Sequence, residues 1–205
     1  MSSEFYMFPT SFAQQRLWVL DQMVPENPFY NLSAAIRLSF PVSIPVFTKC
    51  LNEIVRRHET LRTTFKAVDG QPFQVIASSM EIDLPVHDLT HLVGEAKDLS
   101  VMDLVNTDAR KPFDLARGPL MRTSLIRLGH TEYAFLLSMH HIISDGWCRY
   151  VFFKELTILY ESFLSGKPSP LPELPIQYAD YAVWQLEYLQ GKVLEEQISY
   201  WKQKL

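Results

Sequence analysis

The chain has 205 residues, of which 47% are apolar and 20% are charged, and its formal net charge at pH 7 is −4. This composition can bury the core of one full-sized domain, or of half of a large two-lobed one, and it excludes an intrinsically disordered chain. Lys and Arg form no basic stripe, which argues against a nucleic-acid groove. No apolar run approaches the roughly 18 residues that a membrane-spanning helix needs.

Neither the N-terminal residues nor the cysteines indicate an exported protein. The N-terminal residues lack the basic flank and apolar core of a secretory signal. The two cysteines, Cys50 and Cys148, lie far apart in the sequence and fit neither a disulfide framework nor a zinc ribbon. We therefore expect a cytoplasmic protein with both thiols reduced.

In the first half of the chain, helical and extended patterns alternate. The clearest strand signal covers residues 32–40, where apolar side chains alternate with smaller or polar ones. Thr10 or Ser11 can cap the helix that precedes it. The predicted elements, in chain order, are a helix over 11–23, a strand over 32–40, a helix over 44–58, hairpin strands over 61–68 and 72–77, a strand over 82–87 and a helix over 93–110.

The second half predicts a hairpin, a long helix, a proline-rich strap and two further helices. Four prolines over 167–175 exclude a regular element there and predict an extended strap. The last helix carries an apolar stripe that runs to the chain end. The predicted elements of this half, in chain order, are strands over 120–128 and 132–139, a helix over 146–164, and helices over 178–189 and 192–205. Mixed hairpins and helices indicate an α/β protein, an α+β sandwich with a mixed sheet flanked by helices.

Residues 138–147, SMHHIISDGW, lie where a buried strand ends and a helix begins. If the strand persists, its alternation directs His140 and His141 to opposite sides, one into the packed interior and one into an open cleft. The positive end of the helix dipole favours a neutral imidazole, which a general base requires. Asp145 can cap the helix or pair with an Arg. Gly146 has no Cβ, so other backbone can approach it closely at this turn.

Several of these residues also have plainer interpretations. A histidine at the edge of an apolar strand is usually a satisfied core residue, and the diverging histidines lack a third neighbour for a metal site. Arg16 is as readily a solvated cation as a site residue. Aromatic residues over 178–184 are assigned to the core, where aromatics at helical spacing usually pack. Arg62, in an apolar hairpin, predicts a buried or cleft partner.

Four ordered motifs resemble those of condensation domains of nonribosomal peptide synthetases, in the chloramphenicol-acetyltransferase-like superfamily. The motifs are SFAQQRLW over 11–18, RHETLRTTF over 57–65, MHHIISDGW over 139–147 with the HHxxxDG pattern, and YADYAVW over 178–184. Domains of this family have two similar lobes and about twice this length. The resemblance therefore implies that residues 1–205 are the N-terminal lobe, which contains the strap over 167–175, and that the second lobe is absent.

The resemblance implies amide-bond formation between two carrier-bound thioesters. The aminoacyl or peptidyl groups would be carried on the phosphopantetheine of donor and acceptor peptidyl carrier proteins, and this chain would bind no cofactor and no metal. Nucleic acid and membrane are not expected partners. The string over 142–147 favours the subtype that takes an L-configured donor.

The resemblance also implies a role for each residue of the third motif. His141 would act as a base or orient the attacking amine, and the backbone at Gly146 would lie near the developing oxyanion. Asp145 would pair with Arg62. Cys148, where the family often has Ser, falls on the apolar face of its helix, and we expect little consequence. The implied catalytic set is His141, Asp145 and Gly146, with His140, Arg62 and Trp147 as structural support.

Two alternatives remain at this level. One is a stand-alone trimeric CoA-dependent acyltransferase of the same superfamily, and the other is a non-catalytic lobe that only binds carrier proteins. In the family the site lies in a tunnel between two lobes, of which this chain would supply one wall. Because a base works best where water is excluded, we expect little catalysis from the isolated chain.

Overall fold

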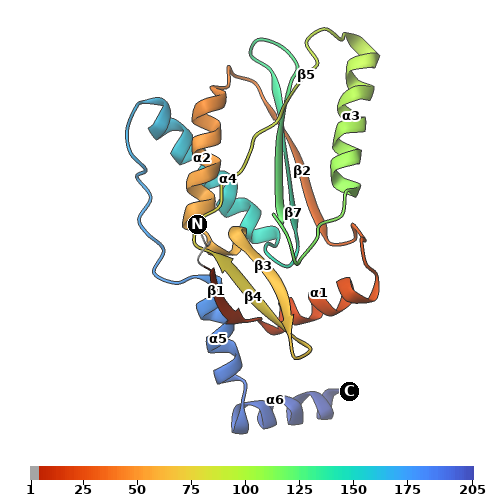
Figure 1. Ribbon diagram of the computed structural model, residues 1–205, viewed down its shortest axis with the longest axis vertical. Helices are drawn as coiled ribbons and strands as arrows, with labels where there is room; N and C mark the ends of the chain where they lie inside the picture. Colours follow the sequence, from red (N-terminus) through yellow and green to blue (C-terminus); the bar gives the residue numbers. More distant parts are fainter. Residues whose placement is uncertain (1–4) are drawn as a thin grey trace.

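The computed structural model describes residues 5–205, which form six α-helices, one 3-10 helix and seven strands in two sheets (Figure 1). The elements are β1 (Phe5–Pro9), α1 (Phe12–Met23), β2 (Asn31–Leu38), α2 (Ile44–Arg57), the 3-10 helix η1 (Glu59–Arg62), β3 (Thr63–Val68), β4 (Gln71–Ala77), β5 (Val86–Asp88), α3 (Gly94–Arg110), β6 (Met121–Arg127), β7 (Tyr133–His140), α4 (Gly146–Leu164), α5 (Tyr178–Tyr188) and α6 (Gly191–Lys204). The larger sheet has the order β2-β7-β6-β5 and is mixed, because only β5 runs parallel to its neighbour. The predicted α/β class is thus confirmed.

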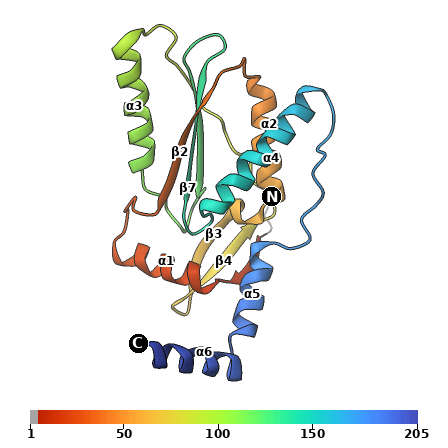
Figure 2. The ribbon, with the colours of Figure 1, turned by 180° about the vertical axis from the view of Figure 1, so that it is seen from behind.

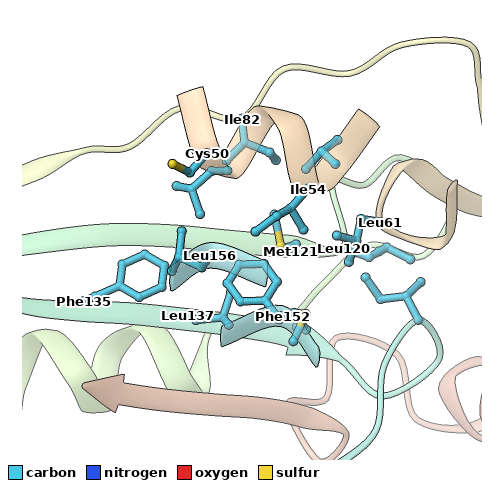
Figure 3. Packing of buried hydrophobic residues seen from close by; sticks show 14 of the residues in the cluster. Cys50, Ile54, Leu61, Ile82, Leu120, Met121, Phe135, Leu137, Phe152 and Leu156 are labelled. Carbon is cyan, nitrogen blue, oxygen red and sulfur yellow. The ribbon is translucent and has the colours of Figure 1, made fainter. Parts of the chain in front are cut away.

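Helices cover both faces of the larger sheet, so its central strand β7 is buried at every residue. On one face α2 and α4 pack against the side chains of Phe135 and Leu137, as the close view in Figure 3 shows. On the other face α3 covers Ala134 and Leu136. The alternation along β7 therefore divides the core into two layers, and the end of this strand is held by both of them.

The smaller sheet, of order β1-β4-β3, contains most of the departures from the sequence-based elements. Strand β1 was not predicted, because its short apolar run becomes a strand only by pairing with β4. Residues 59–62 form a 3-10 turn where the hairpin was expected to begin. The strand expected over 82–87 is shortened to Val86–Asp88, because the backbone N–H of Ile82 bonds to Asn52 Oδ1 and not to a strand.

A buried ionic cluster joins α2 to α4. The guanidinium of Arg57 makes two hydrogen bonds of 3.2 Å to the carboxylate of Glu155, and His58 Nε2 lies 2.9 Å from Glu155 Oε2. Burial raises the pKa of Glu155, but the hydrogen bonds from His58 and Arg57 outweigh it and lower that pKa to about 2. The carboxylate therefore stays ionised beside the guanidinium, which fixes the two helices side by side.

The same arginine holds the proline-rich strap, which has no regular structure over 167–175, as predicted. Arg57 Nη1 donates to the carbonyl oxygen of Pro172 at 2.8 Å. At the end of the strap, Gln177 Nε2 donates to Arg57 O and Gln177 Oε1 accepts from Glu59 N. The strap thus delivers the start of α5 to the junction between α2 and η1.

Helix α6 extends away from the two sheets, as Figure 2 shows from behind. Its predicted apolar stripe is exposed. The stripe consists of Leu194, Ile198, Trp201 and Leu205. Within residues 5–205, no helix is both long and apolar enough to cross a membrane.

We predict that Glu155→Gln destabilises the fold by about 3–5 kcal/mol at pH 7, because it leaves the buried Arg57 guanidinium without its counter-charge. Because the pKa of Glu155 is depressed in the folded chain, its contribution is present above about pH 4.5 and is lost as the pH falls toward about 2. Urea denaturation should therefore show a gap between wild type and variant that shrinks over this range. Glu196→Gln, at an exposed ion pair, is the control and should cost less than about 1 kcal/mol.

Candidate active site

The predicted site lies on a tight turn between β7 and α4. Strand β7 ends at His140, and residues 141–145 lead directly into the first residue of α4. The backbone N–H of His141 donates to Tyr30 O at 2.8 Å, and that of Ile143 donates to His140 O at 3.1 Å. Ile142 and Ile143 are buried, so the turn is anchored by its own apolar side chains. Its backbone positions are thereby fixed.

His140 points into the packed interior, the orientation that alternation allowed for one of the two histidines. It is 2% exposed, and its Nδ1 accepts a hydrogen bond from the backbone N–H of Ile142 at 3.1 Å. The rings of Tyr30 and Phe113 approach it edge-on. Desolvation, aided by the electrostatic effect of the neighbouring His141, lowers the pKa of His140 to about 4. His140 is therefore a neutral core residue at pH 7.

His141 is exposed and diverges from its neighbour, although the strand ends before it. Its Nδ1 lies 2.7 Å from the carbonyl oxygen of Ser144. A carbonyl oxygen can only accept, so Nδ1 carries the proton of the neutral ring. This leaves Nε2 as an unprotonated acceptor. The backbone of the turn thus selects the tautomer that a general base requires.

A cleft of about 450 Å³ contains His141 and is bounded by the turn, by α1 and by the start of α5. Arg16 and Tyr178 both face this cleft, although Arg16 had an equally good interpretation as a solvated cation and Tyr178 was assigned to the core. The core assignment is wrong, since Tyr178, Tyr181 and Trp184 are all exposed. The signal missed was the stripe of tyrosines, whose polar hydroxyls suit a wet surface. The polar residues that line the cleft include Arg16, Tyr30, Thr60, His141, Asp145 and Tyr178.

Asp145 caps α4 and does not pair with Arg62. Its Oδ1 accepts the backbone N–H of Cys148 at 2.7 Å, and hydrogen bonds from Cys148 lower the pKa of Asp145 below its usual value. Arg62 instead donates to Ala77 O and lies 3.4 Å from a carboxylate oxygen of Glu59. The predicted Asp145–Arg62 pair is therefore wrong. The 3-10 turn of η1 directs Arg62 toward the end of β4, away from the cleft.

The three residues that open α4 are all exposed. Gly146 faces open space, because an added Cβ would meet nothing within 4 Å among the described residues. Trp147 is 74% exposed and leans on Tyr150 at a ring-centroid distance of 5.7 Å, so it does not pack beneath the site. The expected burial of Cys148 on the apolar face of the helix is wrong. Its position one turn earlier than Phe152 brings it to the rim of the cleft.

Thiol and metal chemistry have little support in this cleft. Partial desolvation and a hydrogen bond with Asp145 raise the pKa of Cys148 to about 11, so the thiol stays protonated at neutral pH. A thiol in that state is a poor nucleophile. Within residues 5–205, no group of three or more His, Cys, Asp or Glu side chains is arranged to hold a metal ion. The group that the geometry leaves open in this cleft is the imidazole of His141.

Comparison with known proteins identifies relatives across nearly the whole chain. The family model described as "Condensation domain" matches residues 5–205. A linear gramicidin synthase protein of Brevibacillus parabrevis is 48% identical over 197 residues, which are 96% of this chain and 2% of that protein. Phosphinothricin tripeptide synthetase PhsC of Streptomyces viridochromogenes is 42% identical over 197 residues, which are 96% of this chain and 18% of that protein. The chain thus spans a small part of these relatives.

Solved structures share the fold. The starter condensation domain of rhizomide synthetase RzmA matches with a TM-score of 0.87 at 22% identity, over 98% of this chain and 48% of that one. A structure titled as the complex of the X-domain and OxyB from teicoplanin biosynthesis matches with a TM-score of 0.84 at 26% identity, over 96% and 42%. The chain therefore spans about half the length of these folds.

For Asp145→Ala we expect a loss of about 1 kcal/mol in the free energy of unfolding, the usual value of a helix cap. Asp145→Asn is the matched control, because asparagine also caps helices, and it should stay within a few tenths of a kcal/mol of wild type. Urea denaturation at pH 7 measures both. A loss of about 3–5 kcal/mol for Asp145→Ala would instead point to a broken buried ion pair.

Protonation of His140 should make the fold sensitive to mild acid. Its pKa in the folded chain lies below the unfolded value, so the unfolded state binds the proton more tightly and stability falls as the pH drops from about 6.5 to about 4. The shift corresponds to about 3 kcal/mol. His140→Asn retains an acceptor for Ile142 N–H and should flatten this dependence, whereas His130→Ala, at the exposed hairpin turn, should keep it. Equal slopes in wild type and His140→Asn would contradict the assignment.

Proposed function

Because the chain belongs to the condensation-domain family, we propose that it forms amide bonds between two thioesters carried on peptidyl carrier proteins. The observation that carries this proposal is the exposed imidazole of His141, which lines the cleft and whose Nδ1 is bound to Ser144 O, so that Nε2 is left as the acceptor of the neutral ring. An amide-forming site needs such an acceptor for the attacking amine.

In the proposed reaction the amine of the acceptor attacks the thioester carbonyl of the donor. The new C–N bond forms as the C–S bond breaks, the nitrogen loses a proton, and the donor's pantetheine thiol leaves with one. His141 Nε2 accepts a hydrogen bond from the amine, which orients its lone pair and steadies the positive charge that develops on nitrogen. His141 then acts as the base or as the orienting group in the same geometry.

Asp145 and Gly146 serve this step through the start of α4. The cap that Asp145 places on Cys148 N–H fixes the first turn of the helix next to His141. Gly146 presents bare backbone to open space, which lets a carbonyl approach the positive end of the helix. His140 supports the turn from the core. Arg62 contributes indirectly by holding η1, which carries Thr60 at the cleft, to the end of β4.

We assign the chain to the N-terminal lobe of a condensation domain, because its four ordered motifs resemble the opening motifs of that family and it spans about half of the solved chains it matches. The cleft is then completed by a second lobe, and the donor and acceptor carrier proteins deliver their substrates to it. No cofactor of the chain's own is needed, since both thioesters arrive activated. The open cleft of the lobe alone leaves His141 exposed to water, so the isolated chain should turn over slowly or not at all.

His141→Ala tests this proposal in a two-lobed domain that contains the chain as its first lobe. We expect product formation from loaded carrier proteins to fall by about 10²–10⁴-fold, the usual effect of losing a general base. The melting temperature should stay unchanged, because His141 is exposed. His130→Ala is the control and should keep full activity. A His141→Ala rate within a few-fold of wild type would remove this residue from the mechanism, and turnover of free acyl-CoA by the chain alone would favour the stand-alone acyltransferase.

A further inference from the structure

Tyr178 lines the cleft that contains His141, and the proposed reaction does not use its hydroxyl. It is the first residue of α5, is 36% exposed and lines the cleft. Its Oη lies 2.9 Å from Ser11 Oγ, across 167 residues of sequence. Two hydrogen bonds join Gln177, the cap of this helix, to the α2–η1 junction. On its other side, the backbone N–H of Phe12 donates to Gln185 Oε1. The hydroxyl is therefore fixed in place.

The environment of Ser11 decides which of the two hydroxyls donates. Ser11 is fully buried, and its Oγ already accepts the backbone N–H of Gln14 at 3.2 Å. Within residues 5–205, Tyr178 Oη is the one other hydrogen-bond partner of Ser11 Oγ. A buried hydroxyl proton without an acceptor is unfavourable, so Ser11 donates and Tyr178 accepts.

The proton of Tyr178 is then left without a protein partner. Among the described residues, Ser11 is the one hydrogen-bond partner of Tyr178 Oη. Burial raises the pKa of the Tyr178 phenol above its usual value, so the proton stays on the oxygen at neutral pH. The wall of the cleft thus offers a neutral hydrogen-bond donor in addition to the His141 acceptor.

We infer that the Tyr178 hydroxyl binds a carbonyl oxygen of the acyl substrate and so positions that substrate against His141. This inference rests on the proposed function, which supplies the substrate class. An aminoacyl thioester on a pantetheine arm has both matching groups, an amine for the His141 acceptor and carbonyl oxygens for the Tyr178 donor. Arg16 and Asp145, of opposite charge, both line this cleft, so its formal charge selects neither an anionic nor a cationic ligand.

Binding of glycyl-S-N-acetylcysteamine to the 205-residue chain, followed by NMR, tests the inference directly. Tyr178→Phe removes the donor and keeps the ring, so its Kd should rise about 2–10-fold, as expected for one neutral hydrogen bond. Tyr181→Phe is the matched control on the same helix, because that hydroxyl bonds Gln185 and does not line the cleft, and its Kd should equal that of wild type. Equal Kd values for all three proteins, or no saturable binding by wild type, would overturn the inference.

A second probe identifies the carbonyl. In the thioether analogue, CH₂ replaces the thioester carbonyl while the acetamide carbonyl remains. If Tyr178 holds the thioester oxygen, wild type and Tyr178→Phe bind this analogue equally, and if it holds the amide oxygen, the difference between them persists. Should Tyr178→Phe fail to fold, the NMR signal of Tyr178 ¹³Cζ in the wild-type chain provides the test instead. A change in its chemical shift when the probe binds supports the inference, and an unchanged chemical shift overturns it.

The two proposals fail separately. A loss of binding in Tyr178→Phe, together with a His141→Ala domain that still condenses, would keep the carbonyl site and reject the base. A His141→Ala domain that is inactive, together with Tyr178→Phe that binds like wild type, would keep the condensation function and reject the inference.

Discussion

The buried pair of Arg57 and Glu155 is the constraint on which the arrangement of this fold depends. It joins two helices, α2 and α4, which otherwise meet mainly through apolar side chains, with a few further polar contacts such as that from Ser43 N to Tyr160 Oη. Two charges removed from water hold one mutual geometry, because any slippage leaves each of them unpaired. Packing alone would tolerate small sliding of the helices, whereas the bidentate pair fixes their register. The position of the first turn of α4, and of the turn that carries His141, is thereby fixed relative to α2.

The same arginine extends this constraint to the far wall of the cleft. Arg57 holds the strap through a carbonyl oxygen, and its own backbone oxygen receives the side chain of Gln177. Gln177 precedes Tyr178, whose hydroxyl reaches Ser11 at the start of α1. One buried cation thus connects the histidine turn and the tyrosine of the opposite wall. Segments far apart in sequence are brought to one cleft by polar contacts, while the core beneath supplies the stability.

The sequence predicts those parts of this arrangement that depend on local periodicity. The helices over α2, α3 and α4 and the two hairpins all follow from spacing, whereas His141 diverges from His140 in a turn and not by strand alternation. Strand β1 could not be predicted, because its pairing partner lies far along the chain. The predicted pair of Arg62 with Asp145 is wrong because a 3-10 turn directs the Arg62 side chain elsewhere, and residue propensity does not specify such a turn. Tyr178 was assigned to the core because aromatic spacing looks the same on a buried face and on a cleft wall.

The two adjacent histidines show how one motif can divide two tasks. Burial keeps His140 neutral and makes it part of the core, so it can anchor the turn but cannot exchange protons with a substrate. His141 needs no burial to be useful, since the carbonyl of Ser144 selects its tautomer while the ring remains open to the cleft. A backbone acceptor cannot itself ionise, so it holds this tautomer at any pH at which the ring is neutral. In the proposed function the arrangement therefore separates a buried histidine that anchors the turn from an exposed one that meets the substrate.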